Sequence, residues 1–353
     1  MSGARSAEAR EARLLEIREE AATRGVVEAD GVRPGGAPFP VASPETGYYG
    51  RPLLKEPQWK WEVPAYFFVG GAAGAGAIIG AAARVAGGDP ALARDARWIA
   101  AAGGALSPLL LISDLGRPER FINMLRVFKP QSPMSVGSWT LAAFSTAAAS
   151  SLFADMLRER YPSLPVRVLG NAAEAAAAGL GLVMASYTGV LIGATAVPVW
   201  NRHARTLPVH FTASGLATAV SALEIGGHGR SRALNALAIG AALVETAEGL
   251  LIEAETHAVN APLKQGTSGR LTRAGGALSG PLPLALRCLA LLLPERHARP
   301  LRRVASAASI AGSLLTRVGW IQAGHASARD PGPALQLEPA AGEPLSGGRM
   351  SIT

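Results

Sequence analysis

The residues best placed for chemistry form a dense group of ionisable, Pro and Gly residues between two long apolar stretches. The group comprises Asp114-Leu-Gly-Arg117-Pro118-Glu119-Arg120-Phe121 and Pro130-Gln-Ser-Pro133-Met-Ser135-Val-Gly137-Ser-Trp139. Charged side chains at the mouth of membrane-length helices are energetically costly, so the group indicates a site rather than a spacer. Asp114 is a candidate proton relay, whose carboxylate Arg117 or Arg120 would keep ionised. The alternatives are a structural salt bridge for Asp114, which is compatible with the relay, and lipid or partner contact for Arg120.

Further polar residues stand inside the apolar stretches. Tyr187 has a hydroxyl able to bind a ligand oxygen, or simply a neighbouring backbone carbonyl. His210 is either a proton donor and shuttle or an interfacial residue at a helix entrance. Glu245 and Glu248 are three residues apart on one helical face and are candidate proton relays, although pairing with Arg317 explains them equally well.

The composition predicts an all-α integral membrane protein that crosses the bilayer several times. Of the 353 residues, 49% are hydrophobic and 17% charged, which is too apolar for a typical soluble domain. Runs of about twenty apolar residues predict a bundle of eight transmembrane helices. The expected spans are 64–86, 94–113, 134–156, 170–196, 206–226, 233–256, 274–293 and 302–325. The seventh is the weakest, because Pro281 and Pro283 interrupt it and Arg287 lies inside it.

The polar ends of the chain predict three parts. Residues 1–57 form an extramembrane, partly disordered N-terminal tail, 58–327 the membrane domain, and 328–353 a short C-terminal tail. Within the first tail, residues 8–22 are suited to a charged helix and 30–57 to an extended linker. No cleavable signal peptide is expected, since the first apolar run follows a long charged segment.

Charge and cysteine content narrow the possible partners and cofactors. The net charge is +8, but the Arg residues are scattered, which favours contact with anionic lipid of the bilayer over nucleic acid. Arginines near both faces leave the membrane orientation undecided. The single cysteine, Cys288, excludes disulfides and cysteine-ligated iron-sulfur clusters within this chain. No metal site is expected, and any metal redox centre belongs to another subunit.

Eight antiparallel spans would bring several polar and aromatic residues to one membrane face. These residues are Glu62, Tyr66, Asp114, Arg117, Arg120, Trp139, Trp200, His210, Glu253 and His257. Such a convergence suits a ligand with a polar head and an apolar tail, and a quinone is such a ligand. Its reduction or its quinol's oxidation moves two electrons and two protons, so the site needs hydrogen-bonding groups and a proton path to water.

Several motifs in this order resemble the NrfD/PsrC family of integral membrane subunits of polysulfide reductase and related respiratory complexes. Beside the group around Asp114 they are Tyr49-Gly50-Arg-Pro52, Pro57-Gln-Trp59-Lys-Trp61-Glu62-Val-Pro64-Ala-Tyr66-Phe67-Phe68-Val-Gly70-Gly71, Tyr187-Thr188-Gly189-Val-Leu191, Pro198-Val-Trp200 and Arg317-Val-Gly-Trp320-Ile-Gln-Ala-Gly324. The resemblance covers nearly the whole membrane body.

The resemblance implies an eight-helix subunit in the bacterial cytoplasmic (inner) membrane that binds menaquinone or ubiquinone and carries no haem or iron-sulfur cluster. Electrons would pass through a ferredoxin-like iron-sulfur subunit to or from a molybdopterin catalytic subunit. Tyr187 and Asp114 match the family's quinone-contacting Tyr and its acidic residue. The first span departs from polysulfide reductase, with Val63 and Tyr66 where that protein has polar residues, so Tyr66 is a substitute hydrogen-bond partner. His210 and Arg120 complete the candidate pocket.

Three other classes of function are also compatible with the sequence. A haem-b anchor would place His ligands deep inside facing helices, whereas His210, His257 and His325 lie at helix ends. An ion or solute transporter would more often show inverted repeats. A structural anchor that holds the iron-sulfur partner without binding quinone is the third alternative.

Glu174 and Glu224 lie toward the opposite face and would extend a proton path across the membrane.

Overall fold

The computed structural model describes residues 27–28, 31–32, 54–115 and 119–330, apart from the side chain of Arg120. The helices are α2 (Glu62–Val85), α3 (Pro90–Asp114), α4 (Glu119–Met124), α5 (Pro133–Arg160), α6 (Leu164–Gly193), α7 (Pro198–Arg202), α8 (Leu207–Leu223), the π-helix η1 (Glu224–His228), α9 (Arg232–Ala254), the 3-10 helix η2 (Ala258–Asn260), α10 (Ala261–Lys264), α11 (Gly266–Ser279), α12 (Pro281–Leu291) and α13 (Glu295–Arg329). Two short strands, β1 (Val27–Glu28) and β2 (Gly31–Val32), pair antiparallel with Val27 opposite Val32.

Contacts divide the chain into two units, Met1–Arg51 and Pro52–Thr353, and the membrane helices all belong to the second. All of the charged helix expected over 8–22, and most of the linker expected over 30–57, lie outside the described residues. The expected C-terminal tail does so from residue 331 onward.

The polytopic helical architecture is confirmed, with one difference in the spans. Seven segments of the described chain are long and apolar enough to cross a membrane, and α11 with α12 counts as one of them. The expected span over 206–226 is α8, which has 17 residues and continues directly into η1. The helical path ends where Gly227 takes a positive φ of 126°, a conformation that favours glycine.

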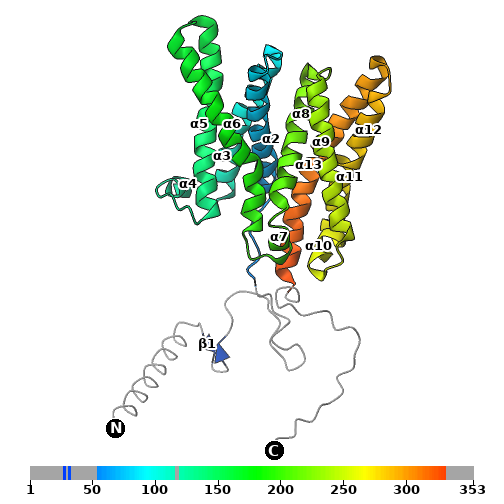
Figure 1. Ribbon diagram of the computed structural model, residues 1–353. Helices are drawn as coiled ribbons and strands as arrows, with labels where there is room; N and C mark the ends of the chain where they lie inside the picture. Colours follow the sequence, from blue (N-terminus) through cyan, green and yellow to red (C-terminus); the bar gives the residue numbers. More distant parts are fainter. Residues whose placement is uncertain (1–26, 29–30, 33–53, 116–118, 331–353) are drawn as a thin grey trace, which may run out of the picture. The chain divides into compact units, whose positions relative to one another are not determined.

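The long helices form two groups of neighbours (Figure 1). Helices α2, α3, α5 and α6 contact one another, and α8, α9, α11, α12 and α13 form the second group. Helices α2 and α6 contact α8, and α2 also contacts α13, so these helices join the groups. The short helices α4, α7 and α10 lie at one end of the bundle, which we call the α7 end, and α12 ends at the opposite end.

Glycines allow close approaches between helices, because small residues let the backbones of membrane helices come near each other. A Cβ on Gly74 of α2 would lie 2.3 Å from the Gly181 carbonyl oxygen of α6. A Cβ on Gly189 would lie 2.5 Å from the Leu207 carbonyl, at the crossing of α6 and α8. These glycines therefore lie in packing seams between helices.

The expected seventh span consists of two helices, α11 and α12, and a proline causes the break between them. Pro281 has no backbone N–H, so it begins α12 instead of continuing the hydrogen-bond ladder of α11. Arg287 of α12, which counted against a membrane span in the sequence, is fully buried. Its guanidinium donates to both carboxylate oxygens of Glu224, at 2.9 and 2.7 Å. Asn235 and Ser306 accept further hydrogen bonds from its terminal nitrogens, so the charge is paired within the protein.

A second buried charge network lies in the first group of helices, also toward the end opposite the α7 end. Glu174 of α6 is 2% exposed and forms ion pairs with Arg84 of α2 and Arg97 of α3. Arg97 also contacts Asp155 of α5 at 2.7 Å. Glu174 and Glu224, both expected to extend a proton path, are thus paired with arginines.

The segment before α2 is fixed to the α7 end by stacking and by an ion pair. Trp59 stacks on Trp200 of α7 with ring centroids 5.3 Å apart. The Arg329 guanidinium at the end of α13 donates to both carboxylate oxygens of Glu56, at 2.9 and 2.6 Å, and His325 lies 3.7 Å away. These contacts hold the start of the first span against the end of the last one.

The buried Arg287 and Glu224 pair should be a strongly coupled determinant of stability. We expect Glu224→Gln or Arg287→Gln alone to lower the free energy of unfolding by about 3 kcal/mol, because each leaves an uncompensated buried charge. The double variant should lose less than the two single losses added together. Denaturant unfolding of the full chain in detergent measures these energies, with exposed Arg303→Gln as the control. Strictly additive losses would contradict the coupling.

The pair between Glu56 and Arg329 predicts a pH dependence of stability. The hydrogen bond from Arg329 lowers the pKa of Glu56 below its usual range. A lowered folded-state pKa stabilises the fold at neutral pH, and this contribution disappears as the pH falls through that value. We therefore expect Glu56→Gln to flatten the fall in unfolding temperature below about pH 4.5. Exposed Glu159→Gln should leave the pH profile unchanged, and an unchanged profile in Glu56→Gln would refute the assignment.

Candidate functional site

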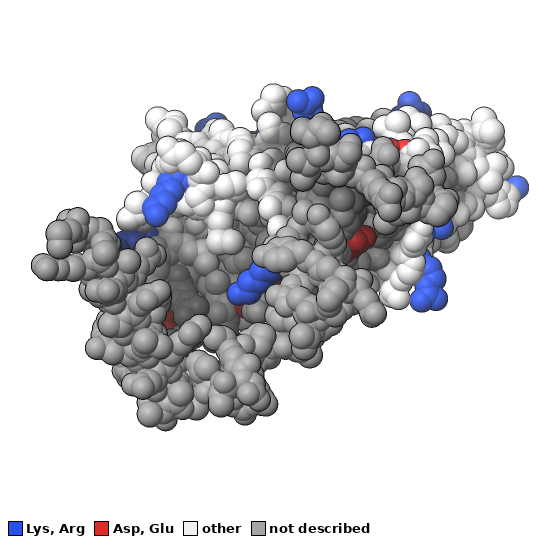
Figure 2. All heavy atoms as spheres, turned by 90° about the horizontal axis from the view of Figure 1, so that it is seen from below, with Lys and Arg blue, Asp and Glu red and all other residues white. Residues whose placement is uncertain are grey.

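The α7 end carries the residues expected to form a site, because the relevant helices begin or end there. Figure 2 shows this end of the molecule, with Lys and Arg side chains at separate points of the visible surface rather than in one patch. Dispersed cations of this kind suit anchoring at a membrane interface.

Tyr187 lies in the last two turns of α6 and is 6% exposed. Its hydroxyl donates to the backbone carbonyl of Pro133 at the start of α5, over 2.8 Å. The ring fits there because residue 137 is glycine, since a Cβ on Gly137 would lie 1.9 Å from Cζ of Tyr187. The Pro133 and Gly137 motif is therefore the seat of the Tyr187 side chain.

Tyr66 of α2 faces the same region from the neighbouring helix. It is 2% exposed, and its ring lies beside Gly70, where α2 meets Met184 of α6. A Cβ on Gly70 would lie 3.3 Å from the Met184 side chain and 3.5 Å from the Tyr66 ring, so both side chains pack closely against this glycine. The buried hydroxyl of Ser107, also beside Gly70, has no hydrogen-bond partner in the described part of the chain.

Asp114 is the last residue of α3 and lies beside Lys60 and Glu62 at the start of α2. Its Oδ1 atom and the Oε2 atom of Glu62 are buried without a hydrogen-bond partner among the described residues. Each of these two carboxylates therefore keeps an unused acceptor, one at the end of α3 and one at the start of α2. Arg117 and the side chain of Arg120 lie outside the described residues, so their pairing with Asp114 stays a prediction. We call Tyr66, Tyr187 and Asp114 the tyrosine group.

His210 lies in a different place, in the first turn of α8, where it is 5% exposed. Its Nδ1 atom is 3.8 Å from Oε2 of Glu245 in α9, and neither ring nitrogen has a hydrogen-bond partner in the described chain. The Glu245 carboxylate is 1% exposed and accepts a hydrogen bond of 2.7 Å from the Ser279 hydroxyl. Glu248, on the next turn, is half-buried. We call His210, Glu245 and Ser279 the histidine group.

Arg317 of α13 is fully buried next to the histidine group. It donates to the hydroxyls of Ser214 and Ser313 at 2.7 and 2.5 Å, and lies over the Phe211 ring at 5.2 Å. The described residues contain no ion pair from Arg317 to Glu245 or Glu248, so the pairing considered from the sequence is replaced by hydroxyl contacts.

Aromatic rings connect the two groups. Ring contacts run from Tyr66 to Phe67 at 5.7 Å, from Phe67 to Phe211 at 6.0 Å, and from Phe211 to His210 at 5.7 Å. Two phenyl rings therefore lie along the path from Tyr66 to His210. The expected single pocket is resolved into two neighbouring polar groups, one in each set of helices.

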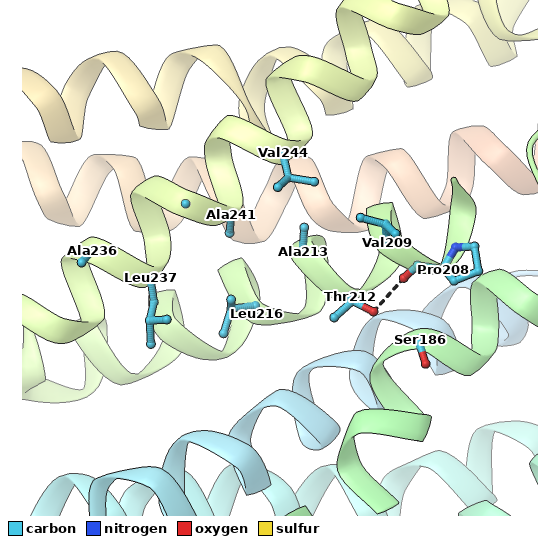
Figure 3. Close-up of a pocket in the computed structure, with 11 residues that line it drawn as sticks. Ser186, Pro208, Val209, Thr212, Ala213, Leu216, Ala236, Leu237, Ala241 and Val244 are labelled. Atoms are coloured by element: carbon cyan, nitrogen blue, oxygen red, sulfur yellow. Dashed lines mark hydrogen bonds between the residues drawn. The ribbon is translucent and has the colours of Figure 1, made fainter. Parts of the chain in front are cut away.

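An apolar groove of about 580 Å³ opens between α6, α8 and α9 (Figure 3). It is lined by Ser186, Pro208, Val209, Thr212, Ala213, Leu216, Ala236, Leu237, Gly240, Ala241 and Val244. The Thr212 hydroxyl is turned to the Pro208 carbonyl at 2.7 Å, as Figure 3 shows. The groove suits a hydrocarbon chain, because its hydroxyls are bonded within their own helices and it holds no ionisable lining residue.

The sequence did not single out some participants. Ser279 looked like an ordinary small residue, although a hydroxyl one helix away is a suitable partner for a buried carboxylate. Arg287 carried a usable signal, because a charge inside an apolar run needs a buried partner. In the described ranges, no group of three His, Cys, Asp or Glu residues is arranged to hold a metal ion.

The chain matches a known family over about half of its length. Residues 54–225 match the family model described as polysulphide reductase, NrfD. The matched part includes Tyr66, Asp114, Tyr187 and His210, whereas Glu245 and Arg317 lie beyond it. No curated protein matches the chain.

The contact of Gly137 with Tyr187 is testable by adding one methyl group. We expect Gly137→Ala to lower the free energy of unfolding by about 1–3 kcal/mol, because the ring must move out of its seat. Gly179→Ala on α6 is the matched control, since a Cβ there meets no atom within 4 Å. Unfolding of both variants in detergent gives the comparison, and equal stabilities would show that Tyr187 is not held as described.

Proposed function

Because the chain belongs to the NrfD family over residues 54–225, we propose that it is the quinone-reactive membrane subunit of an oxidoreductase complex. The observation that carries the proposal is the tyrosine group. Two buried tyrosines lie on the contacting helices α2 and α6, and a carboxylate with an unused acceptor stands at the end of α3, which packs against α2. A buried site with hydroxyl donors and a carboxylate near water is what a quinone headgroup requires.

The residues of the tyrosine group would have different roles, which depend on how far each lies from the aqueous phase. Menaquinone or ubiquinone supplies the two-electron redox step, and the protein must bind its oxygens and exchange two protons with water. The Tyr187 hydroxyl, which now donates to the Pro133 carbonyl, would donate to one quinone oxygen, with Tyr66 as a second donor. Asp114, at the end of α3, would pass protons between this place and the aqueous phase. Arg120 remains a candidate to hold the Asp114 carboxylate ionised.

The histidine group extends the proposal toward a proton relay. Neither ring nitrogen of His210 has a hydrogen-bond partner in the described chain, and the Glu245 carboxylate lies 3.8 Å from Nδ1. The imidazole is therefore able to accept a proton, and the Glu245 carboxylate would stabilise the resulting positive charge. Glu248 is the next carboxylate along α9, one turn from Glu245. The ring contacts place His210 beside, rather than inside, the tyrosine group.

The partner subunits are proposed to dock at the α7 end. The segment between α3 and α5 exposes several large apolar side chains at the membrane boundary: Ile122, Val127, Phe128 and Met134 are all more than half exposed. A hollow of about 450 Å³ lies among them, beside Arg126 and Lys129. An apolar surface with basic edges suits a protein partner. We propose a ferredoxin-like iron-sulfur subunit, linked to a molybdopterin catalytic subunit in the bacterial cytoplasmic membrane.

One observation favours a second candidate function, the purely structural anchor. The Tyr187 hydroxyl already has a partner in the Pro133 carbonyl, as expected of a tyrosine that only packs α6 against α5. In that case the chain would hold the iron-sulfur subunit at the membrane without binding quinone.

Two substitutions distinguish quinone chemistry from passive anchoring. In the purified complex, we expect Asp114→Asn to slow quinol-dependent reduction of the partner's clusters about 100-fold, because a proton carrier is lost. Tyr187→Phe should slow it about tenfold, since one hydrogen bond to the quinone is removed. Ser186→Ala is the matched control, because it removes the neighbouring hydroxyl, which bonds within its own helix.

Assembly of the complex is measured in the same preparations. Wild-type rates in both Asp114→Asn and Tyr187→Phe would refute the quinone site and leave the structural anchor. Full assembly with slow reduction would support the proposal, whereas loss of assembly in either variant would assign that residue to anchoring.

A further inference from the structure

A basic hollow lies at the opposite end of the bundle from the tyrosine group. It has a volume of about 520 Å³ and is lined by Arg84, Val85, Arg158, Pro162, Arg167 and Asn171. Its three arginines come from α2, α5 and α6, so the hollow exists because those helices pack together. Neither the family match nor the proposed quinone chemistry accounts for three guanidinium groups at this place.

The arginines around the hollow outnumber the nearby carboxylates. Arg84 and Arg97 share Glu174, while Arg97 and Arg158 share Asp155. Asn171 accepts hydrogen bonds from both Arg84 and Arg158, and adds no charge. With Arg167, four guanidinium groups meet two carboxylates, which leaves two positive charges at the hollow.

Two of the basic groups keep unused hydrogen-bond donors. Arg167 is exposed, and its guanidinium has neither a hydrogen-bond nor an ion-pair partner within the described chain. The Nε atom of Arg158 is buried and also lacks a partner there. A guanidinium fork with free donors is suited to the oxygens of a phosphate group.

The surroundings of the hollow place it at a membrane boundary. Val85 follows Arg84, Val168 follows Arg167, and Leu164 lies three residues before Arg167; their exposed fractions are 87% for Val85, 71% for Leu164 and 56% for Val168. They lie at the ends of membrane-length helices, where apolar side chains meet acyl chains and basic side chains meet headgroups. A ligand here would meet positive charge on one side and hydrocarbon on the other.

We propose that the hollow formed by Arg84, Arg158, Arg167 and Asn171 binds the phosphodiester headgroup of an anionic phospholipid. The phosphate oxygens accept from Arg167 and Arg158, and the acyl chains lie against Val85, Leu164 and Val168. Basic pockets between membrane helices bind anionic headgroups in this way. Free inorganic phosphate has the same headgroup chemistry but no chains to use the apolar border.

Native mass spectrometry of the purified full chain tests the site directly. The chain is titrated in detergent with phosphatidylglycerol, with phosphatidylcholine of the same acyl chains, and with inorganic phosphate. We expect phosphatidylglycerol to bind most tightly, and Arg167→Gln to weaken its binding about fivefold. Arg167 is exposed and unpaired in the described structure, so its loss should leave the fold intact, which thermal unfolding checks.

Arg299→Gln is the matched control. It removes the same charge from an exposed position at the same end of the bundle, far along the chain from the hollow. We expect it to leave phosphatidylglycerol binding unchanged. Equal loss in both variants would show a general charge effect and overturn the proposal.

Three other results would also overturn the proposal: equal binding of phosphatidylcholine, wild-type binding by Arg167→Gln, or phosphate binding as tight as that of the lipid. The site does not depend on the quinone chemistry, because the tyrosine group lies at the other end of the helices.

Discussion

The fold depends on how its charges are satisfied at membrane depth, because the bilayer core offers no water to hydrogen-bond them. Arg287 shows the rule most clearly. A lone guanidinium inside an apolar helix would be strongly destabilising, yet both carboxylate oxygens of Glu224 accept from it. This pair joins α12 to the end of α8, two elements that are distant in sequence. Glu174 with Arg84 and Arg97 does the same for α6, α2 and α3. Each group of helices is therefore tied together by a buried charge network that tolerates little relative movement.

Beside these ion-paired networks, some buried polar atoms have no hydrogen-bond partner and no arginine ion pair. His210 keeps both ring nitrogens unbonded, and Asp114 keeps one carboxylate oxygen unbonded, among the residues that the structure describes. A buried polar atom that lacks a partner is destabilising unless water, a proton or a ligand completes it. Buried ion pairs between arginines and carboxylates lie toward the end that carries the basic hollow, where Arg158 Nε and both Glu174 oxygens also lack a hydrogen-bond partner among the described residues. At the α7 end, His210 and Asp114 have no arginine ion pair in the described part of the chain, and this is the main physical reason to place ligand chemistry there.

The sequence predicted the helices well, because length and apolarity alone identify a membrane span. It predicted the irregular elements less well. The span over 206–226 ends in a π-helix, which hydropathy does not predict. The prolines predicted the break before α12, but the sequence did not predict that Arg287 would be buried against a carboxylate. For the site, the antiparallel order of the spans predicted that Tyr66 and Asp114 lie at one end, and the structure has them near the start of α2 and at the end of α3. That order did not separate His210 from them, since the position of Phe67 and Phe211 between the groups depends on helix rotation, which spacing does not fix.

Helix α8 is the element through which the two polar groups are able to influence each other. It contacts α2 and α6 on one side and α9 and α13 on the other, and it carries His210 at its start and Glu224 just after its end. Its two ends are constrained differently. Ion pairing of Glu224 with Arg287 fixes one end, whereas His210 at the other end lies near Glu245 without a hydrogen bond. A change of charge at His210 would therefore be felt first at the α7 end, by Glu245 and by the aromatic rings that lead to Tyr66, while the far end of α8 stays in place.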